Sequence, residues 1–212
     1  MTQLKTWMLL GLLVAAFSAQ ATGQDSLDIF VRTAKTGRAD FVQVVTAPAK
    51  DGQTARSRTS SGVFEFSRPN RFKFVYMRPF EQTIVADGET LWLHDVDLNQ
   101  VTARRQAGAL ASTPAALIAS AADLKALEAE FVLSAAPAKD GIEWLIATPR
   151  AKDSALQSVR VGFRGKTLAA LEILDSFGQR SVLTFTAMQT NVAMDPAAFT
   201  FKPPSGADVI RQ

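Results

Sequence analysis

The stretch GVFEFSRPNRFKFVYMRPFEQTIVADGETLWLHDVDLNQVT, residues 62–102, is the densest run of strand-like sequence in the chain. Phe64 and Phe66 alternate, and Phe72, Phe74 and Tyr76 repeat the same two-residue period with charged residues interspersed. This alternation predicts half-buried β-strands. The period alone does not say which side of a sheet each row takes, so Phe64 and Phe66 could belong to the side opposite the other three.

Turn signals divide this stretch into four expected strands. Arg68-Pro69-Asn70 separates the first from the second, because proline is excluded from the interior of a sheet. Asp87-Gly88 lies between two apolar runs and is a strong hairpin signal. The polar residues 95–99 mark the next turn. The prediction is an antiparallel meander with one apolar face.

The first 21 residues have the features of a secretory signal peptide. Lys5 is their only charge, residues 7–17 are apolar, and Ala19-Gln20-Ala21 is a small-x-small cleavage pattern. The apolar run is too short to cross the roughly 30 Å hydrocarbon core of a bilayer. We therefore predict an exported protein in which residues 1–21 are the signal peptide and residues 22–212 form one domain.

Composition disfavours several functions. The formal net charge of +3 is small and no block of like charges occurs, which disfavours nucleic-acid binding. The chain has no cysteine and one histidine, so neither disulfides nor a transition-metal site is expected. It also lacks the G-x-x-x-x-G-K-[ST] and G-x-G-x-x-G motifs, and we expect no cofactor.

The first expected helix covers residues 25–36. Leu27, Phe30, Val31 and Ala34 form one apolar stripe, Asp25 or Ser26 can cap its start, and Gly37 occupies the place of a C-terminal stop.

The second expected helix follows Ser112-Thr113-Pro114, a hydroxyl cap with an early proline, and continues to residue 122. Residues 124–129 either extend it or form a second short turn. This segment is either an ordinary buried helix or a mobile lid, since a short alanine-rich helix has little surface with which to anchor itself.

Further strands are expected around the meander. One lies at residues 41–45 before a loop at 47–59, and residues 104–108 are interpreted as a linker. Glycine turns separate most of six later strands, at residues 131–135, 143–148, 159–164, 168–175, 181–188 and 200–202. About eleven antiparallel strands are more than one flat sheet usually holds. The expected fold is mainly β (α+β), a strongly curved antiparallel sheet whose concave face is covered by two to three helices.

Catalytic motifs are missing. The sequence has no G-x-S-x-G. His94 is next to Asp95, but neighbouring strand residues point to opposite faces, so His94 is interpreted as a surface or strand-packing residue. The protein is not expected to be an enzyme.

Fourteen phenylalanines accompany a single tyrosine. Phenylalanine supplies apolar bulk without a polar group. A large core would use most of them, but a curved sheet with few covering helices need not fill its concave side. An apolar cavity for a hydrophobic ligand is the alternative.

Several short motifs follow one another along nearly the whole mature chain: F-x-Q at 41–43, G-x-F-x-x-x-R-P-N-x-F at 62–72, P-x-E-Q at 79–82, D-G-x-T-L-W at 87–92, N-Q-V-T at 99–102, T-P-x-x-L-I at 113–118 and F-x-F-x-P-P-x-G at 199–206. In this order and spacing they resemble the periplasmic outer-membrane lipoprotein carrier LolA family.

The resemblance implies an unclosed antiparallel β-barrel covered by helices. It also implies a periplasmic shuttle, expected to be a monomer, that takes acylated lipoproteins from the inner-membrane exporter LolCDE to the outer-membrane acceptor LolB, where the organism has one. Other functions stay open. They are a different periplasmic lipid or glycolipid carrier, a lipoprotein-sensing module, and a hydrolase using His94. An acceptor of the LolB kind would need a lipidation cysteine, which this chain lacks.

The resemblance further implies that Arg68 holds a closed form by hydrogen bonds to backbone carbonyls of the lid helix. From the residues alone, Arg68 is more simply interpreted as a solvated side chain at a strand end. We predict that eight residues line or cover the acyl-binding cavity: Phe72, Phe74, Ile84 and Trp92 from the sheet, and Leu27, Phe30, Leu117 and Ile118 from the helices.

Overall fold

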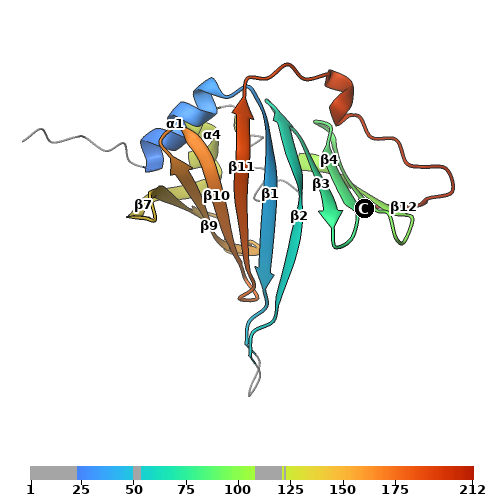
Figure 1. The fold of residues 1–212 in the computed structure, drawn as a ribbon, viewed down its shortest axis with the longest axis horizontal. Coiled ribbons are helices and arrows are strands. Elements are labelled where there is room, and N and C mark those ends of the chain that lie inside the picture. Colours follow the sequence, from blue (N-terminus) through green and yellow to red (C-terminus); the bar gives the residue numbers. More distant parts are fainter. Residues whose placement is uncertain (1–22, 50–53, 108–120, 122) are drawn as a thin grey trace, which may run out of the picture.

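The computed structural model describes residues 23–49, 54–107, 121 and 123–212, and these form one sheet with two α-helices (Figure 1). The signal peptide predicted at residues 1–21 lies outside the described residues, as does nearly all of the helix predicted at 112–122. Within the described part of the chain, no helix is both long and apolar enough to cross a membrane.

Twelve strands make up the sheet in the order β12-β6-β5-β4-β3-β2-β1-β11-β10-β9-β8-β7. Their bounds are β1 Thr36–Thr46, β2 Ser57–Ser67, β3 Arg71–Arg78, β4 Gln82–Ala86, β5 Thr90–Asp95, β6 Gln100–Arg105, β7 Phe131–Lys139, β8 Ile142–Pro149, β9 Leu156–Arg164, β10 Thr167–Asp175, β11 Arg180–Thr190 and β12 Asp208–Arg211. The helices are α1 Gly23–Thr33 and α4 Leu124–Glu130, with a 3₁₀ turn, η1, at Pro196–Phe199.

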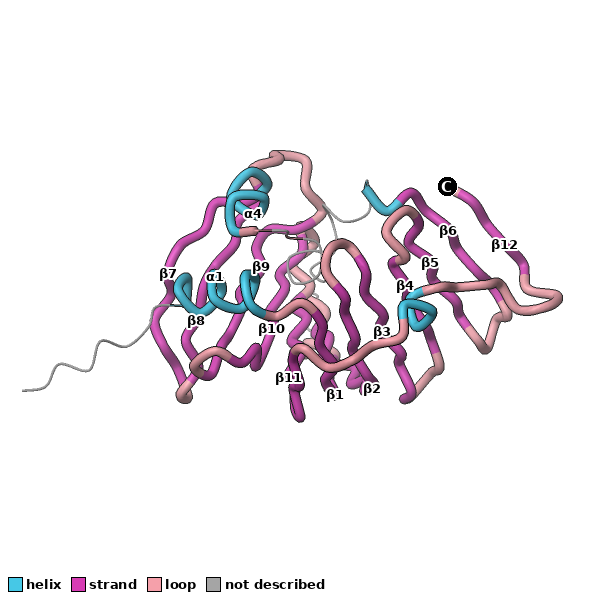
Figure 2. The backbone as a smooth tube through the Cα atoms, turned by 90° about the horizontal axis from the view of Figure 1, so that it is seen from above, coloured by secondary structure: helices cyan, strands magenta, loops and turns pink. Residues whose placement is uncertain are grey.

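The described sheet is not closed. Its end strands, β7 and β12, lie at opposite ends of the molecule and do not pair (Figure 2). All neighbouring strands pair antiparallel except β12, which pairs parallel with β6. The prediction of a mainly β fold with an unclosed antiparallel sheet is therefore confirmed in outline, but the described sheet has twelve strands instead of about eleven, and β12 is parallel to its neighbour. The prediction of one domain at 22–212 stays a prediction.

The sheet curves around α1. Strands β2 and β9 are separated by four strand spacings, which would put them about 19 Å apart in a flat sheet. Yet the ring centroid of Phe30 in α1 is 5.9 Å from that of Phe66 in β2 and 5.7 Å from that of Phe163 in β9. The rings of Phe66 and Phe163 are thus at most about 12 Å apart, which is less than the separation of β2 and β9 in a flat sheet. The face that meets α1 is therefore concave.

Helix α1 begins two residues earlier and ends three residues earlier than expected. It ends at Thr33 because the chain enters β1, where Thr36 pairs with Ser67 and Gly37 pairs with Phe66. Gly37 is thus not a helix stop, which corrects that prediction. A Cβ atom added at Gly37 would lie 2.3 Å from the Phe66 ring, so the glycine makes room for an aromatic side chain.

Three other predictions are wrong. Residues 57–59, predicted as part of a loop, belong to β2, and residues 104–105, interpreted as part of a linker, belong to β6. Residues 200–202, predicted as a strand, are irregular. The last strand instead comes later, where Asp208–Arg211 aligns with Gln100–Ala103. The signal for β6 was weak because only Val101 and Ala103 are apolar and buried there. Residues 124–129, interpreted as an extension of the preceding helix or as a second short turn, lie in α4, which begins at Leu124 with Asp123 as its cap.

Gly62 lies where β2 and β3 come unusually close, at a register shift beside Ser61. A Cβ atom at Gly62 would lie 1.9 Å from the backbone oxygen of Val75, so neither strand could keep its position. We expect Gly62→Ala to lower the free energy of unfolding by about 1–3 kcal/mol, measured by urea denaturation. Gly165→Asn is the matched control, because nothing lies within 4 Å and asparagine tolerates its φ of +56°. Equal stability of the two variants would contradict the close approach.

Candidate functional site

The concave face is built from facing pairs of phenylalanines. In the β2–β3 pairing, Phe64 lies opposite Phe74 and Phe66 lies opposite Phe72, and β4 places Ile84 opposite Phe74. Directly paired residues share one face of a sheet. The three-residue turn Arg68–Asn70 therefore brings the two rows of alternating aromatics onto the same side, which answers the question that the sequence left open.

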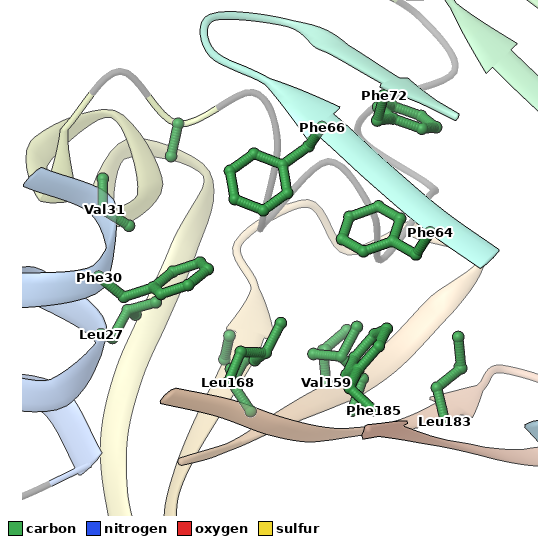
Figure 3. Close-up of a cluster of buried hydrophobic side chains, with 14 of the residues drawn as sticks. Leu27, Phe30, Val31, Phe64, Phe66, Phe72, Val159, Leu168, Leu183 and Phe185 are labelled. Atoms are coloured by element: carbon green, nitrogen blue, oxygen red, sulfur yellow. The ribbon is translucent and has the colours of Figure 1, made fainter. Parts of the chain in front are cut away.

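These side chains belong to a packed cluster of buried hydrophobic residues, in which Figure 3 shows Phe30, Phe64, Phe66, Phe72 and Phe185. We call the connected aromatic members of this cluster the aromatic face. Its members are Phe30, Phe41, Phe64, Phe66, Phe72, Phe74, Tyr76, Phe163 and Phe185. The rings of Phe64 and Phe74 stack with centroids 4.5 Å apart, and Phe41 contacts Tyr76 edge-on at 5.0 Å. Such pairs add about 0.5–1.5 kcal/mol each beyond the area they bury.

The structure brings together five of the eight residues predicted for the cavity. Leu27, Phe30, Phe72 and Phe74 are buried in the core cluster, and Ile84 packs against it. Leu117 and Ile118 lie outside the described residues. The structure adds several aromatic neighbours that sequence reasoning did not assign to this face, namely Phe41, Phe64, Phe66, Phe163 and Phe185. A register argument across the Arg68–Asn70 turn would have found Phe64 and Phe66.

The prediction that Trp92 lines the cavity is wrong. It pairs with Val85, whereas Ile84 pairs with Leu93, so Trp92 points to the opposite face of the sheet. There its ring lies 5.5 Å from that of Phe201, and its Nε1–H donates to Asp87 Oδ2 at 2.8 Å. Trp92 therefore packs under the C-terminal segment and does not line the concave side.

His94 shares that opposite face. Its ring centroid is 5.8 Å from that of Phe201, which fits the interpretation of a strand-packing residue. In the described part of the chain, no group of three or more histidines, cysteines, aspartates or glutamates is placed to hold a metal ion.

Arg68 joins the aromatic face to two backbone segments. Its Nε donates to the oxygen of Ala34 at 2.8 Å, its Nη1 donates to the oxygen of Ala121 at 2.9 Å, and its backbone N–H donates to Lys35 at 2.8 Å. The carbonyl oxygens of Ala34 and Lys35, just after α1, lack partners within that helix. Because Arg68 donates to both, it acts as the C-terminal cap of α1. Ala121 belongs to the segment that precedes α4.

The guanidinium of Arg68 is held in apolar surroundings. Its central carbon lies 5.6 Å from the ring centroid of Phe30 and 5.4 Å from that of Phe66. Burial lowers the pKa of Arg68 to about 10, so the side chain is still charged at neutral pH. Its Nη2 is buried and has no hydrogen-bond partner among the described residues. The contact is therefore specific but not fully satisfied.

The aromatic face ends at Tyr76 beside a pocket of about 430 Å³. Gln43 of β1 and Ser60 of β2 line this pocket together with residues of the β3–β4 and β5–β6 turns. Phe80 and Leu98 on those turns are 67% and 70% exposed. A buried apolar surface thus continues into an accessible hollow at one end of the sheet.

The fold and the site define a class of protein with an open, curved β-sheet whose concave face is aromatic. Residues 32–202 match the family described as "Outer membrane lipoprotein carrier protein LolA". The chain belongs to this family. LolA proteins are periplasmic lipoprotein carriers, and this membership confirms that the chain is a carrier and not an enzyme.

Relatives support the assignment over the full chain. An outer-membrane lipoprotein carrier protein of Albidiferax ferrireducens is 66% identical over 205 residues, covering 94% of this chain and 96% of the relative. A carrier of the same description from Methylibium petroleiphilum is 52% identical and covers 98% of both chains. Among solved structures, an uncharacterized conserved protein from Thermus thermophilus aligns with a TM-score of 0.54 over 89% of this chain and 98% of its own, at 12% identity, which supports the fold alone.

Tyr76 offers a direct test of how dry the aromatic face is. Burial raises the pKa of Tyr76 to about 12. It is the only tyrosine, so the absorbance of tyrosinate reports this residue alone. We expect a titration midpoint near 12 in the folded protein, returning to about 10 in denaturant. Because the unfolded chain loses this proton first, stability should fall as the pH rises above about 10. A folded-state midpoint near 10 would place the phenol in water.

Proposed function

We propose that the protein is a periplasmic chaperone that binds the acyl chains of lipoproteins on its aromatic face. In this proposal the signal peptide at residues 1–21 exports the chain, which then works as a monomer. It receives lipoproteins from the inner-membrane LolCDE complex and delivers them to the outer membrane, through LolB where that acceptor exists. The observation that carries the proposal is the continuous aromatic face, in a chain that is 66% identical to an outer-membrane lipoprotein carrier protein.

The physical need for such a surface is large. Each CH₂ group moved from water to an apolar site contributes roughly 0.8 kcal/mol, so several long acyl chains amount to tens of kcal/mol. A carrier has to offset most of that cost and still release its cargo. An aromatic face meets the first requirement, because phenylalanine presents apolar area without groups that need hydrogen bonds.

Release needs a competing state, and we propose that Arg68 supplies it as a latch. With the latch closed, the aromatic side chains pack against one another and the Arg68 guanidinium bridges Ala34 and Ala121. Cargo has to open this arrangement, so the cost of opening reduces its apparent affinity. The latch is not strongly held, since its charge is desolvated and Nη2 has no hydrogen-bond partner in the part of the chain that the structure describes. Because the closed state is only weakly stabilised, cargo can open it and bind, and because closing is still favourable, it promotes the release of cargo.

Carriage can be tested with spheroplasts. The mature protein is added to spheroplasts that retain newly made lipoproteins in the inner membrane, and the supernatant is examined for a soluble complex. We expect a complex of one carrier with one lipoprotein, and none with a variant of the cargo that lacks its acylated cysteine. Lipoproteins that stay in the membrane in both cases would refute the proposal.

The latch is tested by Arg68→Leu. We expect this variant to take up lipoprotein at least as well as the wild type but to transfer it to LolB more slowly, by roughly tenfold or more. The loss of two charge-assisted hydrogen bonds removes the state that competes with cargo. The measurement is the rate of transfer from purified, loaded carrier.

Arg78→Leu is the matched control for that experiment. Arg78 also precedes a proline, but its side chain is exposed. This variant should load and release normally. Normal release by Arg68→Leu would count against the latch while leaving the carrier function intact.

A further inference from the structure

Gln106 is a buried polar side chain that none of the predicted roles includes. It follows the last residue of β6 and is 1% exposed. Within the described residues, only Ser26 and Ser181 are other buried polar side chains. A buried amide costs stability unless it is hydrogen-bonded. The position therefore requires specific partners.

Both ends of the Gln106 amide are hydrogen-bonded. Its Nε2 donates to the backbone oxygen of Asn70 at 2.6 Å, and its Oε1 accepts from the backbone N–H of Gly88 at 2.9 Å. Its own backbone N–H donates to the oxygen of Glu89 at 2.8 Å. One side chain thus joins the β2–β3 turn to the β4–β5 turn. Among side chains of this shape, an amide supplies a donor and an acceptor together at any pH, whereas a carboxyl group does so only when protonated.

The first of these turns carries Arg68. Asn70 is two residues from Arg68, and its backbone is in the left-handed region with a φ of 65°. Arg68 has to reach Ala34 and Ala121, which belong to different segments, from one fixed origin. Hydrogen bonds weaken quickly beyond about 3.2 Å or when they bend. A small movement of the turn would therefore break one or both of them.

We infer that Gln106 is a positioning residue for the Arg68 latch. It holds the carbonyl of Asn70 and so sets the place from which the guanidinium reaches its two acceptors. This inference rests on the proposed function for its effect on cargo, but its effect on the position of Arg68 is independent of that function. Asn70 contributes through its backbone oxygen, so Asn70→Gly should preserve the hydrogen bond from Gln106 and the position of Arg68.

The first test follows Arg68 itself, without cargo. The Nε–H of Arg68 is bonded to Ala34 and should exchange slowly with solvent in NMR spectra of protein labelled at arginine. We expect Gln106→Met, which keeps the volume but removes the donor and the acceptor of the amide, to speed that exchange by roughly tenfold. Gln179→Met is the control, because Gln179 is exposed and, among the described residues, its hydrogen bonds with Asp175 are made by its backbone.

A conservative variant sharpens this test. Gln106→Glu keeps an acceptor for Gly88 but loses the donor to Asn70 when ionised, and regains it when protonated. Relative to the wild type at the same pH, exchange of the Arg68 Nε–H should be fast at neutral pH and return towards normal on acidification. A role in general stability alone would not give that recovery. Unfolding curves establish that each variant is folded under the conditions used.

The second test is a double-mutant cycle on transfer to LolB. Gln106→Met should slow release several-fold in the wild-type background and have little further effect in the Arg68→Leu background, since both changes act through one contact. Additive effects would overturn the inference, as would unchanged Arg68 exchange in the folded variants. If the wild type carries no lipoprotein, the proposed function fails, but the exchange experiment still decides whether Gln106 positions Arg68.

Discussion

The pairing of β2 with β3 is the constraint on which the rest of the site depends. Its register sets Phe64 against Phe74 and Phe66 against Phe72, so four large rings project from one side of two strands. A shift by one residue would send a row of them to the other face. Curvature then brings these rings towards Phe163 on β9, with Phe30 of α1 between them. The packed aromatic side chains thus give the concave side its apolar character.

A charged group at the edge of this surface gives it a second property. Arg68 lies beside the rings of Phe30 and Phe66, and among the described residues its side chain donates to backbone oxygens and to no carboxylate. The fixed geometry of these hydrogen bonds makes the contact specific, while desolvation of the charge reduces the free energy that the contact contributes. A side chain held in this way is suited to a contact that has to form and break. The buried amide of Gln106 makes hydrogen bonds to the turn from which Arg68 extends and to the β4–β5 turn.

The opposite face is organised by the C-terminal segment. After β11 the chain crosses to β3, where Lys73 donates to the oxygen of Ala198, and Phe199 is buried. It then covers Trp92 and His94 with Phe201 before β12 adds to β6. This explains why Trp92 was assigned to the wrong side, since its hydrophobic surroundings come from a segment more than a hundred residues later. The aromatic content of a strand does not reveal which of its faces a distant segment will cover.

Local patterns in the sequence determined much of the outcome. Alternating aromatics, the Arg68–Asn70 break, the Asp87-Gly88 hairpin and the stripe of α1 all depend on neighbours within a few residues, and all reappear in the structure. Tertiary structure alone decided the side of the sheet taken by Trp92, the use of Gly37 to admit the Phe66 ring, and the burial of Gln106 after a strand with a weak pattern. These features depend on pairing between distant strands and on contacts across turns. Neither distant strand pairing nor a contact across turns produces a periodic pattern in the sequence, because the two partners of each contact are far apart along the chain.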